Sequence, residues 1–322
     1  MKSRDIMYLS GLLENDCKNI PTFSRPLDES ERIIYKGFFP NLNLSTAKAT
    51  SISTECYNCV AWTLGITDDW LWPEFHAYTT DKDTTLEDFD KFYEKMGFVR
   101  AASDKEAHIT AWGNTTPEGK LYMTHASVTY PDYQGQWESK LGKFIRMKHD
   151  PNDLQGNSYG RRVAYYKKST TQDLLQTRLR LIKERRPVTY DEAIKLNRKL
   201  VMLPKALIDS FDNKYEFWKE TWDDSSDVLA TFSSNPTTFK LSNEYQELVK
   251  LGKNSDILPL IVLRLLFFKN DFFALQLYDE LQANKSLVVE YDDNFHLLEG
   301  EKGRAHLTVK KYISLRFSFI FN

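Results

Sequence analysis

Apolar positions in the first half of the chain change from a helical period to an alternating one. Apolar residues recur three or four positions apart between a capping box at 84–87 and Gly97, which predicts an amphipathic helix there. These residues are Leu86, Phe89, Phe92 and Met96. From residue 106 the period is two, which predicts strands at 107–112, 120–130, 136–142 and 161–166, and residues 143–147 are a candidate extension of the sheet after a bend. Residues 1–50 contain three prolines and are expected to wrap irregularly around this core. A helix followed by an antiparallel sheet is an α+β plan.

The second half of the chain keeps a helical period almost throughout. A polar helix rich in Leu, Lys and Arg is expected over 170–186, and Pro187 ends it. Further helices are expected over 190–200, 207–222 and 242–251, and a buried pair over 257–268 and 272–281. The tail alternates only weakly. The change in character predicts two domains, an α+β domain over 1–168 and a mainly helical domain over 169–322.

A cysteine lies where a polar loop enters a short apolar helix. Residues 51–58 are polar and turn-prone, and the run from Cys59 to Gly65 is helix-compatible. A thiol in the first turn of a helix has a lowered pKa, and the thiolate is the nucleophilic form. Cys59 is therefore a candidate nucleophile.

His125 is the candidate base for this thiol. It lies in the strand expected at 120–130, after the cysteine in chain order. In a thiol hydrolase Cys59 would attack a carbonyl carbon, and His125 would hold the thiolate and protonate the leaving group. The backbone N–H of Cys59 would supply half of an oxyanion hole. The alternative for both residues is simple packing, since buried free cysteine is common.

The group that would orient His125 has two main candidates. If 131–135 is a hairpin turn, Ser139 lies nearly opposite His125 and shares its face with Trp137. Glu138 is chemically the better orienter but points the other way. Asp132 and the pair at 149–150 are weaker candidates, and each of these residues also suits a solvated or turn position.

Cys56 and Cys59 form a C-x-x-C pattern, which a redox dithiol would also use. No thioredoxin-like β-α-β run surrounds the pattern. Zinc needs four ligands, and no second C-x-x-C or H-x-H-type pattern supplies them. No glycine-rich phosphate loop occurs either. We therefore expect neither a metal nor a cofactor, and Cys56 is either a resolving thiol or a packing residue.

Composition limits the class of partner. The 322 residues are 41% hydrophobic and carry a net charge of -2, which gives no support for nucleic-acid binding. The basic cluster at 178–186 is interpreted as a solvated helix face. The most apolar window, 257–278, is interrupted by polar residues, so no membrane span is expected, and no signal peptide is recognisable. Three cysteines are too few for a disulfide scaffold, which favours the cytoplasm.

The tryptophans near the cysteine have two interpretations. Trp70 and Trp72 lie in one loop, and Trp137 follows the expected hairpin turn. They either cover the core or line a substrate groove, and we carry all three as candidate substrate-binding residues.

Several motifs together resemble a bacterial domain family of unknown function. They are Tyr57-Asn58-Cys59-Val60-Ala61-Trp62 with Gly65, Asp69 with 70–73, 85–89, 97–98, Thr124-His125-Ala126-Ser127, 136–142, His149, 154–156 and Tyr159-Gly160. The resemblance covers about residues 30–167. It implies a papain-like cysteine hydrolase fold, with Cys59 and His125 as the catalytic pair. Papain-like enzymes often place a glutamine before the cysteine; residues 41–58 contain none, so Asn58, Ser53 or a backbone amide would complete the oxyanion hole.

The second half is weakly similar to a helical module of bacterial proteins that has no assigned catalysis. The similarity rests on Tyr245 with 248–252, 257–261 and 272–275. We expect a partner-binding or regulatory domain there. The whole chain then predicts a cysteine peptidase or amidase that acts on a protein or peptide substrate, in bacterial defence or as a toxin-like effector. The alternatives are an inactive papain-like binding module and a dithiol redox protein.

Overall fold

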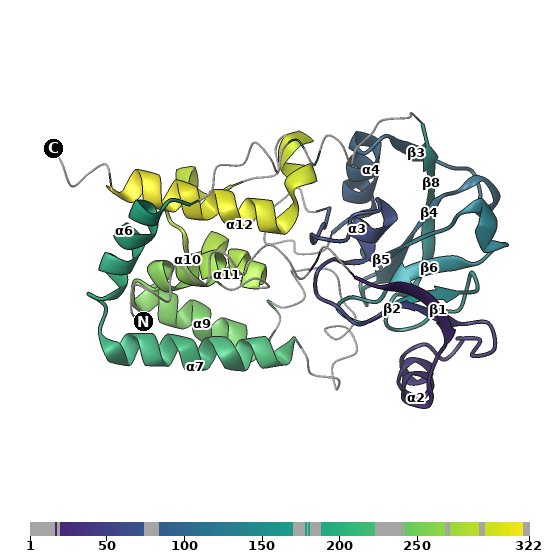
Figure 1. Cartoon of the computed structure of the whole chain (residues 1–322), viewed down its shortest axis with the longest axis horizontal. Coiled ribbons are helices and arrows are strands. Elements are labelled where there is room, and N and C mark those ends of the chain that lie inside the picture. The colour runs from purple at the N-terminus through teal and green to yellow at the C-terminus, as the bar shows by residue number, and fades with distance from the viewer. Residues whose placement is uncertain are drawn as a thin grey trace.

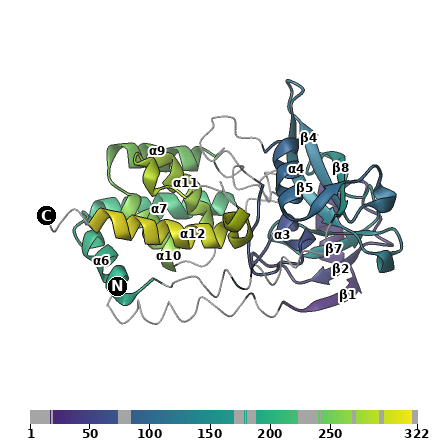
Figure 2. The ribbon, with the colours of Figure 1, turned by 90° about the horizontal axis from the view of Figure 1, so that it is seen from above.

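The computed structural model describes residues 17, 20–73, 84–169, 178, 180, 188–222, 240, 242–267, 271–289 and 294–317. In these residues the chain forms an α+β part followed by a helical part, which lie beside each other (Figures 1 and 2). The predicted α+β fold class and the helical C-terminal region are therefore confirmed.

One eight-stranded sheet forms the centre of the α+β part. Its strand order is β1-β2-β7-β6-β5-β4-β8-β3, and every ladder is antiparallel. The strands are β1 (Thr22–Pro26), β2 (Lys48–Ser51), β3 (Phe98–Arg100), β4 (Ile109–Thr115), β5 (Leu121–Val128), β6 (Trp137–Lys140), β7 (Arg146–His149) and β8 (Arg161–Lys168). The expected irregular wrap over residues 1–50 is wrong where the structure describes it, because β1, a helix and most of β2 lie there.

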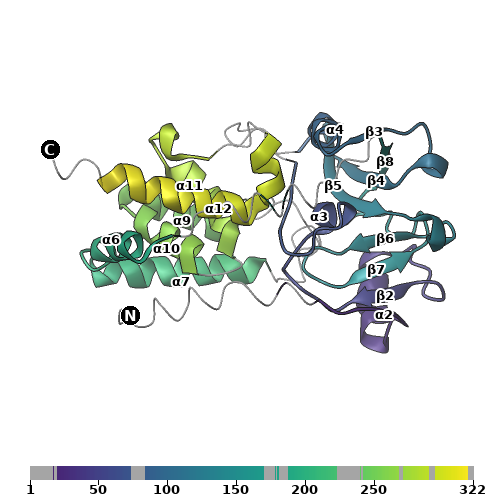
Figure 3. The same cartoon turned by 45° about the horizontal axis from the view of Figure 1, so that its top comes forward.

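The described helices that accompany the sheet are α2 (Glu29–Phe38), α3 (Cys59–Thr63) and α4 (Leu86–Lys95). The predicted amphipathic helix is α4, although its capping box begins one residue later than expected. Thr85 is the N-cap, and Asp88 rather than Glu87 returns the second hydrogen bond. Helix α3 packs against β5 and β6 (Figure 3).

The two faces of the sheet contribute to two separate cores. Ala111 of β4 and Ala126 of β5 pack with α3 and α4, together with Cys59. Trp112, the next residue of β4, packs in a second core with residues of α2 and the 154–159 loop. Consecutive strand residues point to opposite faces, so both sides of the central strands are buried.

Among the residues that the structure describes, the second part contains six α-helices: α6 (Tyr190–Leu200), α7 (Lys205–Thr221), α9 (Asn243–Asn254), α10 (Leu258–Phe267), α11 (Ala274–Leu281) and α12 (Asn294–Phe317). The predicted capping box of α6 is confirmed, with Thr189 and Glu192 as its members. The weakly alternating tail is α12, which is interrupted at Gly300, where φ is 65°. The aromatic core of this part includes one residue from the α+β part, Trp70.

Candidate functional site

Cys59 is the first residue of α3, as the local pattern predicted. The preceding residue, Asn58, caps the helix, because its Oδ1 accepts the N–H of Ala61 at 3.0 Å. Asn58 also donates from Nδ2 to the carbonyl of Leu71 at 2.6 Å, which fixes the following loop. Cys59 forms no disulfide, and its side chain is completely buried. The cap therefore positions the thiol but does not present it to solvent.

A buried lysine lies near Cys59 and connects the loop before α3 to the turn between β6 and β7. Lys140 of β6 donates from Nζ to the carbonyls of Thr54, Gly142 and Phe144 at 2.6–2.8 Å. Burial lowers the pKa of Lys140 well below its ordinary value, and the charge of a Cys59 thiolate acts in the opposite direction. Its three acceptors give this lysine a structural role.

His125 is packed in the core of the sheet. Its ring stacks on Tyr159 with the centroids 3.9 Å apart and the planes at 8°. Both ring nitrogens are buried, and neither has a hydrogen-bond partner in the part of the chain that the structure describes. Burial, and then the neighbouring His149, lower the pKa of His125 well below its ordinary value. The imidazole is therefore neutral at physiological pH.

Cys59 and His125 belong to opposite faces of the sheet. His125 lies directly opposite Trp112 in the β4–β5 ladder, and paired residues share a face. Ala126, the next residue, packs with Cys59 in the core beneath α3. The structure does not bring the two predicted catalytic residues together, since no described residue hydrogen-bonds to either nitrogen of His125.

Ser139 hydrogen-bonds to a different histidine, His149. Ser139 Oγ lies 2.9 Å from His149 Nε2 and 2.7 Å from Ser127 Oγ, and Trp112 donates to Ser127 at 2.8 Å. His149 Nδ1 lies 2.8 Å from the carbonyl of Asp150, so Nδ1 carries the proton and Nε2 accepts. Burial is the main cause that lowers the pKa of His149 to about 4. Ser139 thus belongs to a buried chain of hydrogen bonds rather than to a Cys–His site.

Glu138 points to the other face, toward α3. It accepts from the hydroxyl of Tyr133 at 2.6 Å and from Thr50, and lies 3.3 Å from the guanidinium of Arg146. Arg146 in turn lies over the ring of Trp62 in α3 at 3.9 Å. Glu138 is therefore a member of a buried ion pair, and neither candidate orienter contacts His125.

All three candidate substrate-binding tryptophans are buried. Trp70 packs against Phe272 and Phe273 of the helical part. Trp72 donates to Thr84 at 2.7 Å, and Trp137 lies in the sheet. Trp70 and Trp72 belong to hydrophobic cores, which was the alternative interpretation, and the ring of Trp137 lies 5.9 Å from the guanidinium of Arg162.

The cysteines pair differently from the C-x-x-C interpretation. Cys56 forms a disulfide with Cys17, and Cys59 is the cysteine outside the disulfide. The C-x-x-C pattern indicated Cys59 as the partner of Cys56, whereas the actual partner, Cys17, lies 39 residues away in the sequence. No group of three or more His, Cys, Asp and Glu residues suited to a metal occurs among the described residues.

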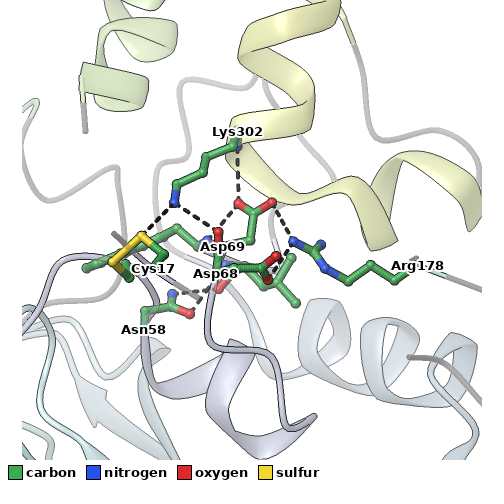
Figure 4. A network of polar contacts seen from close by, with 9 residues as sticks. Cys17, Asn58, Asp68, Asp69, Arg178 and Lys302 are labelled. Carbon is green, nitrogen blue, oxygen red and sulfur yellow. Dashed lines mark hydrogen bonds and ion pairs between the residues drawn. A yellow bond between two sulfur atoms is a disulfide. The ribbon is translucent and has the colours of Figure 1, made fainter. Parts of the chain in front are cut away.

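The contact between the two parts was not anticipated from the sequence. Asp69 Oδ2 accepts from Arg178 at 2.9 Å, and its Oδ1 accepts the backbone N–H of Lys302 at 3.2 Å (Figure 4). The carbonyl of Trp70 accepts the N–H of Glu301 at 3.0 Å. Arg178 was interpreted as part of a solvated basic face, but it is only 2% exposed. Arg180 is exposed, and the rest of that cluster lies outside the described residues.

Comparisons with known proteins give one match. Residues 48–167 match the family model of DUF7689, a domain of unknown function. This supports the resemblance to a family of unknown function that the motifs indicated. We found no match among curated proteins or solved structures. No helix in the described residues is long and apolar enough to span a membrane.

Proposed function

We propose that this chain is a non-catalytic binding protein, in which the N-terminal domain keeps Cys59 and His125 for packing and the helical domain contacts a partner protein. The observation that carries the proposal is the separation of the two residues by the sheet. Cys59 packs with Ala126, whereas His125 stacks on Tyr159 on the opposite face. A thiol hydrolase needs its imidazole within hydrogen-bond reach of the sulfur.

The helical domain offers exposed apolar side chains for such a partner. Val201 and Met202 follow α6, and both are largely exposed. Phe217 is 59% exposed and lines an open hollow of about 660 Å³ between α7 and α9. Aromatic side chains in such positions are common anchors in protein–protein contacts.

The reactivity of Cys59 tests the proposal. Cys17 and Cys56 are joined, so iodoacetamide added to the unreduced protein reports on Cys59 alone. We expect alkylation at neutral pH to be more than about tenfold slower than that of a small free thiol, because burial disfavours the thiolate. Cys59→Ala provides the unlabelled control. Alkylation faster than that of the small thiol would contradict a packing role.

A papain-like thiol hydrolase is the second candidate, and the state of His125 favours it. Two buried nitrogens without a described partner are unusual and call for an explanation, which a catalytic role would supply. The capped position of Cys59 is also the one that a nucleophile would occupy. In this candidate a protein or peptide amide is cleaved after β5 has rearranged to bring His125 to the α3 face.

An active-site probe separates the two candidates. A peptide carrying an electrophilic carbonyl should label Cys59 in the wild type and lose the label in both Cys59→Ala and His125→Gln if the chain is a hydrolase. Under the binding proposal, His125→Gln leaves the slow alkylation of Cys59 unchanged, because the histidine does not act on the thiol.

A further inference from the structure

The Cys17–Cys56 disulfide lies where the two domains meet. It joins the N-terminal segment to the loop that precedes α3, across 39 residues of chain. Both cysteines are buried in the same core as Cys59. Figure 4 shows the disulfide beside the aspartates of the domain contact. The bond therefore constrains chain segments on which the contact depends.

Lys302 of the helical domain connects the sulfur to the aspartates. Its Nζ lies 3.7 Å from Cys17 Sγ and donates to the carbonyl of Asp68 at 2.9 Å. Its backbone N–H donates to Asp69. Lys302 thus contacts the disulfide through its side chain. It contacts the loop at Asp68 and Asp69 through both its side chain and its backbone.

We propose that Cys17–Cys56 is a thiol–disulfide exchange site that holds the domain contact closed when oxidised and loosens it when a dithiol reductant opens it. The ammonium of Lys302 stabilises negative charge on Cys17, which makes Cys17 the better leaving group. Arg178 also lies at this contact, where its guanidinium pairs with the carboxylates of both Asp68 and Asp69. Glu55, which precedes Cys56, and Glu301, which precedes Lys302, add two further acidic residues to the segments that meet here.

The exchange proceeds in two steps. One thiolate of the dithiol attacks Cys56 Sγ, the bond to Cys17 breaks, and Cys17 leaves as a thiolate beside Lys302. The second thiol of the reductant then loses its proton and attacks the reductant's first sulfur, which is bonded to Cys56 Sγ in the mixed disulfide. That bond breaks, and Cys56 leaves as a thiolate that takes up a proton. The protein disulfide is reduced and the dithiol becomes a cyclic disulfide. Because both cysteines are buried, local opening precedes the attack.

Reduction weakens the contact for two reasons. The N-terminal segment is no longer tied to the loop before α3. In addition, the ammonium of Lys302 gains a thiolate partner that competes with the carbonyl of Asp68. The adjacent hydrogen bonds, from Lys302 N–H to Asp69 and from Glu301 N–H to Trp70, then weaken and open more often.

The first experiment follows reduction of the full-length protein by dithiothreitol, with alkylation and peptide mass mapping. We expect a Cys17–Cys56 linkage in the air-oxidised protein and its reduction without global unfolding. Lys302→Gln should slow reduction at least threefold at fixed pH. Lys311→Gln is the matched control, because Lys311 also lies on α12 and donates to a backbone carbonyl, that of Val288, at 2.9 Å. Absence of the linkage, or equal rates in the two variants, would overturn the proposal.

The second experiment measures amide hydrogen exchange in the oxidised and reduced protein. Exchange at Glu301 and Lys302 should accelerate about tenfold on reduction, whereas the amides of β4 and β5 should stay protected. Cys17→Ser should reproduce the reduced pattern without reductant. Unchanged exchange at residues 301–302 would refute a role in the domain contact, and acceleration at all sites together would show unfolding instead. Neither readout depends on whether Cys59 is a nucleophile.

Discussion

Asp69 of the α+β part caps a helix of the helical part. Its Oδ1 accepts the backbone N–H of Lys302, two residues after Gly300 interrupts α12. A side-chain oxygen that accepts an N–H of the first turn is the usual cap of a helix, here supplied from 233 residues away. A Cβ on Gly300 would lie 2.6 Å from Asp69 Cγ, so the close approach requires glycine at this position.

We predict that Asp69→Asn destabilises the protein by about 2–4 kcal/mol, since it leaves a buried guanidinium without its buried carboxylate. Burial lowers the pKa of Arg178, but Asp69 and Asp68 outweigh it and the net shift is upward. Urea unfolding at pH 7 measures the change. Asp68→Asn is the matched control: its side chain is 43% exposed, so we expect less than about 1 kcal/mol. Equal losses in the two variants would contradict this assignment.

Trp70→Ala should destabilise the helical part although Trp70 precedes it in the sequence by many residues. Trp70 packs edge-on against Phe273 and close to Phe272, inside the aromatic core. Truncating a large buried aromatic side chain costs about 3–5 kcal/mol. Near-ultraviolet circular dichroism during thermal unfolding follows the change. Phe217→Ala, at an exposed position, should cost less than about 1 kcal/mol; a comparable loss there would contradict the prediction.

Local signals predicted the elements whose evidence lies within one stretch of chain. The capping boxes of α4 and α6 and the alternation of β4 and β5 are of this kind. The strands β1, β2 and β3 were missed because each has at most five residues, too few to show a clear alternation, and β1 also follows Pro21 and ends at Pro26. The burial of Arg178 depends on aspartates about 110 residues away, which no local pattern reveals.

The candidate site illustrates a different limit. Alternation along β6 correctly separated Ser139 from Glu138, and Ser139 does lie on the face of His125. Alternation cannot say which core each face meets, because both faces of the central strands are buried. A bulge between Trp112 and Gly113 also shifts the β4–β5 register next to His125. The position of α3 relative to His125 therefore required the three-dimensional structure.

Acid should destabilise the protein through its buried histidines. The folded pKa of His149 is about 4, below the ordinary value of 6.5, so the unfolded state binds the proton first. The contribution of neutral His149 to the free energy of unfolding is fully present above pH 6.5. It is lost as the pH falls through about 4, which lowers the free energy of unfolding by about 3 kcal/mol. His125 shifts in the same direction. Urea titrations between pH 7 and pH 4 should show this loss, and His149→Gln should flatten it. A wild-type stability that is constant over this range would contradict the buried neutral state.

Ser139→Ala distinguishes a structural serine from one that orients a catalytic base. The substitution removes the hydroxyl between Ser127 and His149, so a buried imidazole nitrogen loses its partner. An unsatisfied buried group costs about 1–3 kcal/mol, and we expect that loss in urea unfolding. Ser127→Ala, which interrupts the same chain one hydroxyl earlier, should cost a similar amount. The alkylation rate of Cys59 should be the same in both variants and the wild type, because neither serine acts on α3. A rate that falls in Ser139→Ala but not in Ser127→Ala would instead assign Ser139 to a catalytic site.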